Sequence, residues 1–235
     1  MQIFMNGRGE KDFAPDQIIA SVTFNYHADT YDEALKGGVE KVKNYIDGIA
    51  ETTDFKPEDF KTKAYSVQER FHTNRLDPKT EADLGKNLQK RISDGFFFTQ
   101  FACLEFDYDK MRLAKLLATS SKNPDAPMLH IDFTLKDVES KKRELIAVAY
   151  DDAKKKAEAL ATAANKNLRD CVRVEIDSVP HNGMRGDAMF VEAAKFRGAP
   201  ATDDFEQQIK NIDETFKPDD ITLSKEISCV WETSN

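Results

Sequence analysis

The chain has 235 residues, of which 32% are charged and 40% are hydrophobic, and its formal net charge is −8 at pH 7. This acidic balance argues against DNA, RNA or an anionic lipid surface as the main partner, because those partners need a cationic face. The apolar fraction is large enough for a buried core without metal or disulfide staples. No apolar run approaches the roughly 20 residues of a membrane helix. We therefore expect a globular protein that binds neither nucleic acid nor membrane.

The N-terminus and the cysteines both indicate a cytoplasmic protein. The polar run over residues 6–10 follows the first five residues at once, so the apolar stretch is far shorter than the roughly 7–15 residues of a signal-peptide core. The three cysteines are far apart in sequence, and each lies in a strand-like run: Cys103, Cys171 and Cys229. This placement favours reduced thiols packed as small hydrophobic side chains. A redox-sensing thiol is the alternative, and only Cys171 has a base nearby in sequence, Arg169.

In chain order, the first elements predicted are two strands and a helix. Residues 2–8 and 17–27 are rich in β-formers, and the Ala-Pro-Asp sequence at 14–16 sets the turn between them. Thr30 and Glu33 form a capping box that opens the helix. Behind it, apolar residues recur at spacings of 4, 3, 4 and 3 and predict the buried face: Leu35, Val39, Val42, Ile46 and Ile49.

Gly37 and Gly38 lie inside this helix, and we interpret them as the place where its backbone packs closely on a sheet.

A hairpin follows this helix. Strand character resumes at residues 60–71 and again at 95–107. The polar residues 72–94 between them show no firm period, which predicts a long charged loop at the tip of the hairpin.

The second half is dominated by one long helix. Before it, a short helix opens after Asp109 and ends at Asn123, and residues 128–135 form a strand. The long helix spans about 137–164, and one face is mostly alanine, which lets it lie close on a sheet: Leu145, Ala149, Ala153, Ala157, Leu160 and Ala164.

Two strands and an irregular segment complete the chain. Residues 171–178 and 221–232 have strand character. Residues 180–215 are punctuated by glycine and proline and contain two possible short helices. This segment is either a surface excursion packed on the core or an arm that docks on a neighbouring subunit.

No motif predicts a reaction. Gly7 and Gly9 begin like a dinucleotide-binding loop, but Asp12 stands where the third glycine is needed. There is no Walker A, His-Glu-x-x-His, Cys-x-x-Cys or Gly-x-Ser-x-Gly sequence. The histidines are isolated in sequence, and we expect ordinary face or loop side chains rather than ligands: His27, His72, His130 and His181. We therefore assign no catalytic, cofactor-binding or metal-binding residue and expect no cofactor.

Two charged clusters have both a functional and a structural interpretation. The carboxylates of Asp107 and Asp109 suit a hard cation. They stand at a strand-to-helix junction, however, where capping of the first turn is the interpretation that we favour. The basic runs 141–143 and 154–156 would suit a nucleic acid, but acidic residues interleave with them. We therefore expect a solvated helix face.

Several stretches of the chain together resemble the SIMPL-domain family: residues 6–10, 14–16, 33–34, 61–67, 131–137 and 149–161. The resemblance covers about residues 3–178 and the last strand near 221–232. It implies an α+β domain without an agreed enzymatic activity, whose relatives are described as interaction or stress-associated proteins. Many bacterial members look exported through signal peptides, which the start of this sequence does not resemble.

Taken together, these observations predict an α+β protein with a mainly antiparallel sheet, packed helices and the element order ββαββαβαββ. We expect one domain over residues 1–235, with 180–215 as an excursion or arm and 216–235 returning as the final strand. The expected function is non-catalytic: a self-associating, interaction- or stress-related protein, because long strands with exposed edges invite pairing between subunits. The alternative is a small-molecule-binding or hydrolytic domain with residues 72–94 as its lid.

Overall fold

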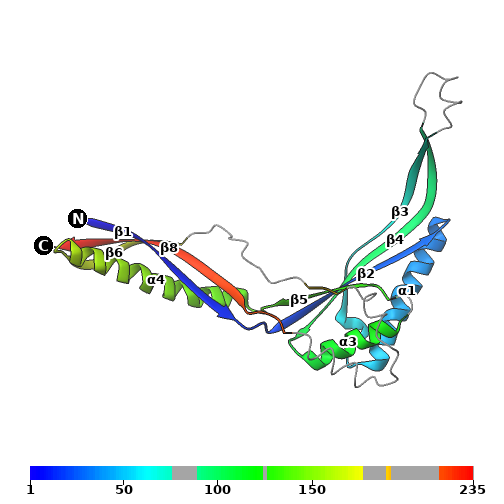
Figure 1. The fold of residues 1–235 in the computed structure, drawn as a ribbon, viewed down its shortest axis with the longest axis horizontal. Coiled ribbons are helices and arrows are strands. Elements are labelled where there is room, and N and C mark those ends of the chain that lie inside the picture. Colours follow the sequence, from blue (N-terminus) through cyan, green and yellow to red (C-terminus); the bar gives the residue numbers. More distant parts are fainter. Residues whose placement is uncertain (76–88, 124–125, 177–188, 192–216, 235) are drawn as a thin grey trace. The chain divides into compact units, whose positions relative to one another are not determined.

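A computed structural model describes residues 1–75, 89–123, 126–176, 189–191 and 217–234 (Figure 1). These residues confirm the α+β class, with helices and two antiparallel sheets where one sheet was expected. The elements follow the order ββαββαβαββ, with one further short strand before the last. The chain forms two compact units. Unit 1 comprises residues 1–17, 133–187 and 218–235, and unit 2 comprises residues 18–132 and 188–217. The single domain over residues 1–235 stays a prediction.

Unit 1 is a three-stranded sheet with one long helix on it (Figure 1). The strand order is β1-β8-β6, and both pairs are antiparallel. The bounds are β1 Gln2–Phe13, β6 Asn167–Ile176, β8 Ile221–Ser234 and α4 Val138–Ala163. Helix α4 packs mainly on β1 and β8. The core of the unit lies between this helix and the inward-facing side chains of those two strands, among them Ile3, Ile227 and Trp231.

The alanine face predicted for α4 is confirmed along most of its length. Leu145, Ala149, Ala153 and Ala157 are fully buried, and the row continues in steps of four to Ala161. The prediction is wrong at the C-terminal end, where Leu160 is 44% exposed and Ala164 is the exposed cap residue. Each step of four advances about 40° around a helix, so the buried row follows the twist of the sheet beneath it.

Two glycines in β1 let α4 come this close. A Cβ atom on Gly7 would lie 1.9 Å from the carbonyl oxygen of Ala149, and one on Gly9 would lie 2.3 Å from that of Leu145. No real Cβ atom tolerates such distances, so any side chain at either position forces the helix away from the strand. Gly7 and Gly9, which begin like a dinucleotide-binding loop, therefore form the surface against which α4 packs.

Hydrogen bonds at two places fix the position of α4 along the sheet of unit 1. The Asp152 carboxylate accepts from the backbone N–H of Arg8 at 2.9 Å and from Lys156 Nζ at 2.7 Å. Near the other end, the Asp16 carboxylate accepts from the backbone N–H of Lys136 at 2.7 Å and from Lys141 Nζ at 2.6 Å. Charge-assisted bonds of this kind are short and directional.

The helix has a definite cap at each end. The Asp137 carboxylate accepts from the backbone N–H of Ser140 at 2.8 Å. After the last turn, Asn165 adopts a φ of 53°, and the Lys166 N–H reaches back to the carbonyl oxygen of Ala161 at 2.9 Å. This left-handed residue after the cap satisfies carbonyls that the helix leaves open. The predicted helix bounds of 137–164 are confirmed to within one residue.

Unit 2 is built on a five-stranded sheet in the order β3-β4-β2-β5-β7. The strand bounds are β2 Gln17–Ala28, β3 Phe60–Arg75, β4 Gln89–Asp107, β5 Met128–Thr134 and β7 Met189–Val191. The helices are α1 Tyr31–Thr52 and α3 Lys110–Lys122, with a 3-10 turn at Pro57–Asp59. Alternate residues of β2 are buried, as half-buried strands require: Ile18, Ala20, Val22 and Phe24.

The hairpin of β3 and β4 is confirmed, but its predicted loop is too long. Residues 72–75 and 89–94 pair as strands, so the expected loop 72–94 is wrong at both ends. These polar residues carry no alternation because, where burial is described at 72–73 and 91–94, no side chain is buried. Residues 76–88 lie outside the described residues.

The cap of α1 is confirmed, but its buried face differs from the prediction. The Glu33 N–H donates to Thr30 Oγ1 at 3.3 Å. The buried row is Ala34, Gly38, Val42, Tyr45 and Ile49, which confirms the predicted Val42 and Ile49, whereas Leu35 and Ile46 are only partly buried and Val39 is 52% exposed. The small residues face the sheet because a Cβ atom on Gly38 would lie 2.3 Å from Cγ of Phe98. The close packing predicted at Gly38 is therefore confirmed, and Val39 beside it is turned outward.

The remaining strand predictions are confirmed in part. Strand β6 begins four residues before the predicted Cys171 and is described to Ile176, and β8 covers the predicted 221–232. Within the predicted excursion 180–215, β7 pairs antiparallel with β5, with Val191 opposite Leu129. The two short helices expected in that excursion lie outside the described residues.

We predict that Gly9→Ala destabilises the protein by about 1–3 kcal/mol, because the new methyl group overpacks the contact with α4. Gly48→Ala is the matched control, since Gly48 lies in the interior of α1 and a Cβ atom there meets nothing within 4 Å. That variant is expected to gain up to about 1 kcal/mol from helix propensity. Urea unfolding measures both changes, and equal effects of the two substitutions would contradict the packing argument.

Acid is expected to weaken unit 1 through Asp16. Burial raises the pKa of this carboxyl, but the hydrogen bonds from Lys141 and Lys136 outweigh burial and hold the pKa below its ordinary value of 3.8. Because the folded pKa is the lower one, the stabilisation is complete above 3.8 and is lost as the pH falls through the folded value. When the pH is lowered from about 6 to 2, the free energy of unfolding of the Asp16→Asn variant should therefore fall less than that of the wild type.

Urea midpoints across this pH range test the acid dependence. Lys141→Met removes the side-chain donor to Asp16 and should likewise reduce the acid dependence. An Asp16→Asn protein with the full acid dependence of the wild type would contradict this assignment.

Candidate functional site

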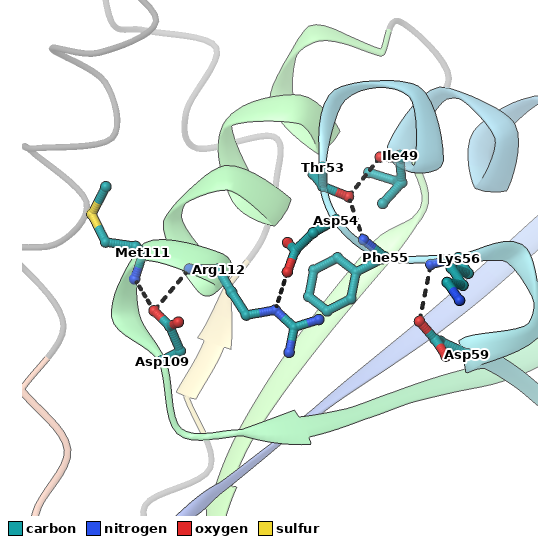
Figure 2. Close-up of polar contacts among 9 residues, drawn as sticks. All are labelled: Ile49, Thr53, Asp54, Phe55, Lys56, Asp59, Asp109, Met111 and Arg112. Carbon is teal, nitrogen blue, oxygen red and sulfur yellow. Dashed lines mark hydrogen bonds and ion pairs between the residues drawn. The ribbon is translucent and has the colours of Figure 1, made fainter.

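Polar side chains of unit 2 gather where α1 ends and α3 begins (Figure 2). Thr53 Oγ1 donates to the carbonyl oxygen of Ile49 at 2.6 Å, and the backbone N–H of Phe55 donates to the same hydroxyl at 3.3 Å. The backbone N–H of Lys56 donates to Asp59 Oδ2 at 2.9 Å. These bonds satisfy the last turn of α1 and the 3-10 turn that follows, so they shape the loop.

Arg112 links this loop to α3. Its Nε lies 2.9 Å from Asp54 Oδ2, and its guanidinium carbon lies 4.4 Å from the centre of the Phe55 ring and 5.4 Å from that of Phe106. The two rings contact each other edge to face at 5.0 Å. Figure 2 shows the Arg112 guanidinium beside the Phe55 ring, with its Nε joined by a dashed line to the Asp54 carboxylate. A paired and stacked guanidinium of this kind holds two elements together.

Asp109 at the start of α3 acts as the sequence predicts. Asp109 Oδ1 accepts from the backbone N–H groups of Met111 at 2.8 Å and Arg112 at 3.2 Å, which is an N-cap (Figure 2). The capping interpretation is therefore confirmed for Asp109. Among the described residues, no three His, Cys, Asp or Glu side chains cluster as a metal site requires.

Two of the four histidines meet at a bulge in β4, although 45 positions separate them. His72 pairs with the Asp94 carboxylate, and His27 Nε2 lies 2.5 Å from the carbonyl oxygen of Asp94. The next residue, Gly95, has a φ of +84°, and the pairing register of β3 with β4 shifts beside it. Sequence reasoning missed this pair, because the bulge that brings these side chains together leaves no pattern in the sequence.

Of the other two histidines, the described residues include His130 but not His181. His130 Nε2 lies 3.0 Å from Asp132 Oδ1 on the same strand, as expected of a satisfied face histidine. His181 lies outside the described residues.

The basic runs of α4 form a solvated, ion-paired face, as predicted. The pairs are Lys142 with Glu139 at 3.2 Å, Lys154 with Glu158 at 4.0 Å and Lys156 with Asp152 at 2.7 Å. All three pairs lie one turn apart on the helix, and their lysines are about half exposed. Such pairs contribute only about 0.3–0.5 kcal/mol each. They neutralise much of the local charge that a nucleic acid would need.

The cysteines are free thiols. Cys103 is 4% exposed in β4 and Cys229 is fully buried in β8, which confirms their role as small hydrophobic side chains. Cys171 in β6 is only partly buried.

The outer strand β6 presents the most unusual surface of unit 1. Among the described strands, only β8 pairs with it, so its other edge has backbone donors and acceptors available. Three of its apolar side chains are about half exposed: Val172 at 51%, Val174 at 48% and Ile176 at 46%. Helix α4 covers mainly the other two strands, which leaves these side chains uncovered by it.

The opposite edge of the same sheet is different in character. Toward its C-terminal end, β1 presents exposed charged residues, which discourage pairing with another strand: Arg8, Glu10, Lys11 and Asp12. Exposed apolar side chains on an edge strand are the feature that natural sheets usually avoid. The edge of β6 is therefore the candidate interaction surface of this protein.

None of the described helices combines the length and the apolar character that crossing a membrane requires.

Comparison with known proteins extends the assignment to both units. The model of the SIMPL family, described as "Protein of unknown function (DUF541)", matches residues 3–231. Among curated proteins, no sequence matches the chain. The family match spans nearly the whole chain and agrees with the resemblance found in the turns, caps and strands of the sequence. The chain therefore belongs to the SIMPL family.

Proposed function

We propose that this SIMPL-family protein is a non-catalytic protein that associates with a second copy of itself through the edge of β6. The observation that carries the proposal is this edge, where three half-exposed apolar side chains follow one another along a strand that pairs on one side only among the described strands. Pairing two such edges satisfies backbone groups and removes apolar surface from water at the same time.

The order of side chains in β6 suits antiparallel pairing with itself. If two copies pair about Val174, Arg173 of each lies opposite the partner subunit's Glu175, and Val172 lies opposite the partner subunit's Ile176. In the single chain, Arg173 and Glu175 already pair with each other. Both side chains are exposed. In a two-fold dimer they can therefore replace this ion pair within one chain by the corresponding ion pairs between the two chains. An isologous interface of this kind is self-complementary and closed.

The polar groups of unit 2 support a non-catalytic role. Asp109 is engaged in capping α3, and Asp54 is engaged with Arg112. Each of these groups fixes an element of the fold, which is the kind of use that a scaffold protein makes of its charged residues. The proposal includes a cytoplasmic location, which the free thiols favour because that compartment keeps thiols reduced.

Two parts of the sequence analysis stay predictions. A stress-related role rests on the family resemblance. The alternative of a ligand-binding or hydrolytic domain needs a lid at residues 72–94, whose tip at 76–88 lies outside the described residues.

We predict that the purified protein has a mass of at least twice 26.6 kDa in solution and that Val174→Lys shifts it toward 26.6 kDa. A lysine on the edge opposes pairing because its charge must be desolvated in the interface. Light scattering after size-exclusion chromatography, at several protein concentrations, measures the mass.

Val39→Lys is the matched control for Val174→Lys. Val39 is 52% exposed on α1, so it introduces the same charge at a similarly exposed valine away from β6. This variant should keep the mass of the wild type. A wild-type protein of 26.6 kDa at the highest concentration would overturn self-association, and a Val174→Lys variant with the wild-type mass would overturn the role of β6.

A further inference from the structure

Two of the three cysteines lie on adjacent strands of unit 1. In the antiparallel pair of β6 and β8, Cys171 lies opposite Trp231, and Val174 lies opposite Cys229. Two positions along β8 therefore separate the two cysteines. In the sequence they are far apart, and only the pairing of the last strand with β6 brings them into the same region.

A bulge puts both thiols on the same face of the sheet. The register shifts between Cys171 and Arg173, which makes Val172 an extra residue in β6. Without the shift, alternation from Val174 would place Cys171 opposite Glu232, on the face away from α4. Because a slip of one residue turns a side chain to the other face, the extra residue turns Cys171 toward α4. Cys171 consequently packs against the buried cluster that contains Cys229 and Trp231.

The two side chains are in contact there. The Cys171 side chain packs against the buried cluster of which Cys229 is a member, close enough to influence the Cys229 thiol. Burial, followed by the neighbouring Cys171, raises the pKa of Cys229 to about 11. The hydroxyl of Tyr150 on α4 also contacts Cys171, and burial is the main reason that the pKa of Tyr150 is raised. The two thiols therefore form a pair at the boundary between the core and the solvent.

The two thiols differ in access. Cys229 is 0% exposed, whereas Cys171 is partly exposed on the outer strand. A small oxidant from solution therefore reaches Cys171 first, and Cys229 is held beside it in a position to react second. Redox-active cysteine pairs commonly combine one accessible thiol and one resolving thiol in this manner.

We propose that Cys171 and Cys229 are a redox pair that hydrogen peroxide oxidises to an intrachain disulfide. In the first step, the Cys171 thiolate attacks one peroxide oxygen, the O–O bond breaks, and the hydroxide released takes up a proton to become water. In the second step, the Cys229 sulfur attacks the sulfur of the Cys171 sulfenic acid. The S–O bond breaks, and the oxygen leaves as a second water with the Cys229 proton. The two thiols lose two electrons, and the peroxide gains them.

The bond would tie the outer strand to the centre of its sheet. Strand β6 is an edge strand, held among the described strands by β8 alone, and α4 gives it little cover. A covalent link to β8 restricts how far β6 separates from the sheet in any opened state. This consequence concerns the stability of the single chain, so it does not depend on self-association.

The test uses the full chain, first reduced and then treated with hydrogen peroxide. Peptide mapping by mass spectrometry without reductant is expected to show one cross-linked pair that contains Cys171 and Cys229, about 2 Da lighter than the two reduced peptides together. Reductant should reverse the link. Electrophoresis without reductant should show the monomer mass, because the link lies within one chain. The oxidised protein should also unfold at a higher urea concentration than the reduced one.

Two variants make the test specific. Cys171→Ser changes the partly exposed member and should abolish both the link and the shift in urea midpoint. Cys103→Ser changes a buried cysteine of unit 2 and should keep both. Peroxide treatment that leaves both thiols free, that stops at sulfinic acid on Cys171, or that links Cys171 of two chains would overturn the proposal.

Discussion

The close contact between the backbone of β1 and helix α4 is the constraint on which unit 1 depends. It requires glycine at positions 7 and 9, because any Cβ atom there would overlap the carbonyl oxygens of the helix. It also requires a row of alanines on the helix, which meets those glycines without a large side chain between them. Because both surfaces are small, neither strand nor helix can move apart or turn without opening voids, so the contact fixes the position of α4.

The same contact determines what the helix leaves uncovered. Alanine and glycine bury little apolar area per residue, so the large buried side chains of this unit come from elsewhere, among them Ile227 and Trp231 of β8. A helix drawn tightly onto β1 and β8 extends only slightly over the third strand. The valines and the isoleucine of β6 keep about half of their surface exposed as a result. The candidate interaction edge is thus a consequence of how closely the helix lies on the other two strands.

Much of the fold could be predicted because it depends on periodicity and on local hydrogen bonds. The alternation in β2, the alanine row of α4 and the caps at Thr30 and Asp109 are all visible within a few residues of sequence. The buried face of α1 was predicted correctly at Val42 and Ile49 and wrongly at Val39, because hydrophobicity points to Val39 whereas close approach to Phe98 selects the small Gly38. The predicted loop of the hairpin was too long, because strands without a buried face carry no alternation.

The features that bear on function arise from register, which composition and periodicity do not encode. At Asp94, a bulge in β4 brings together two histidines from different strands. At Val172, one extra residue in β6 turns Cys171 from the open face of the sheet toward the helix, where Cys229 lies. That same residue is among the exposed apolar side chains of the edge. A single inserted position therefore affects two properties of β6, since it adds Val172 to the exposed apolar side chains and places the Cys171 thiol against the core, and both follow from pairing with a strand about 60 residues away in sequence.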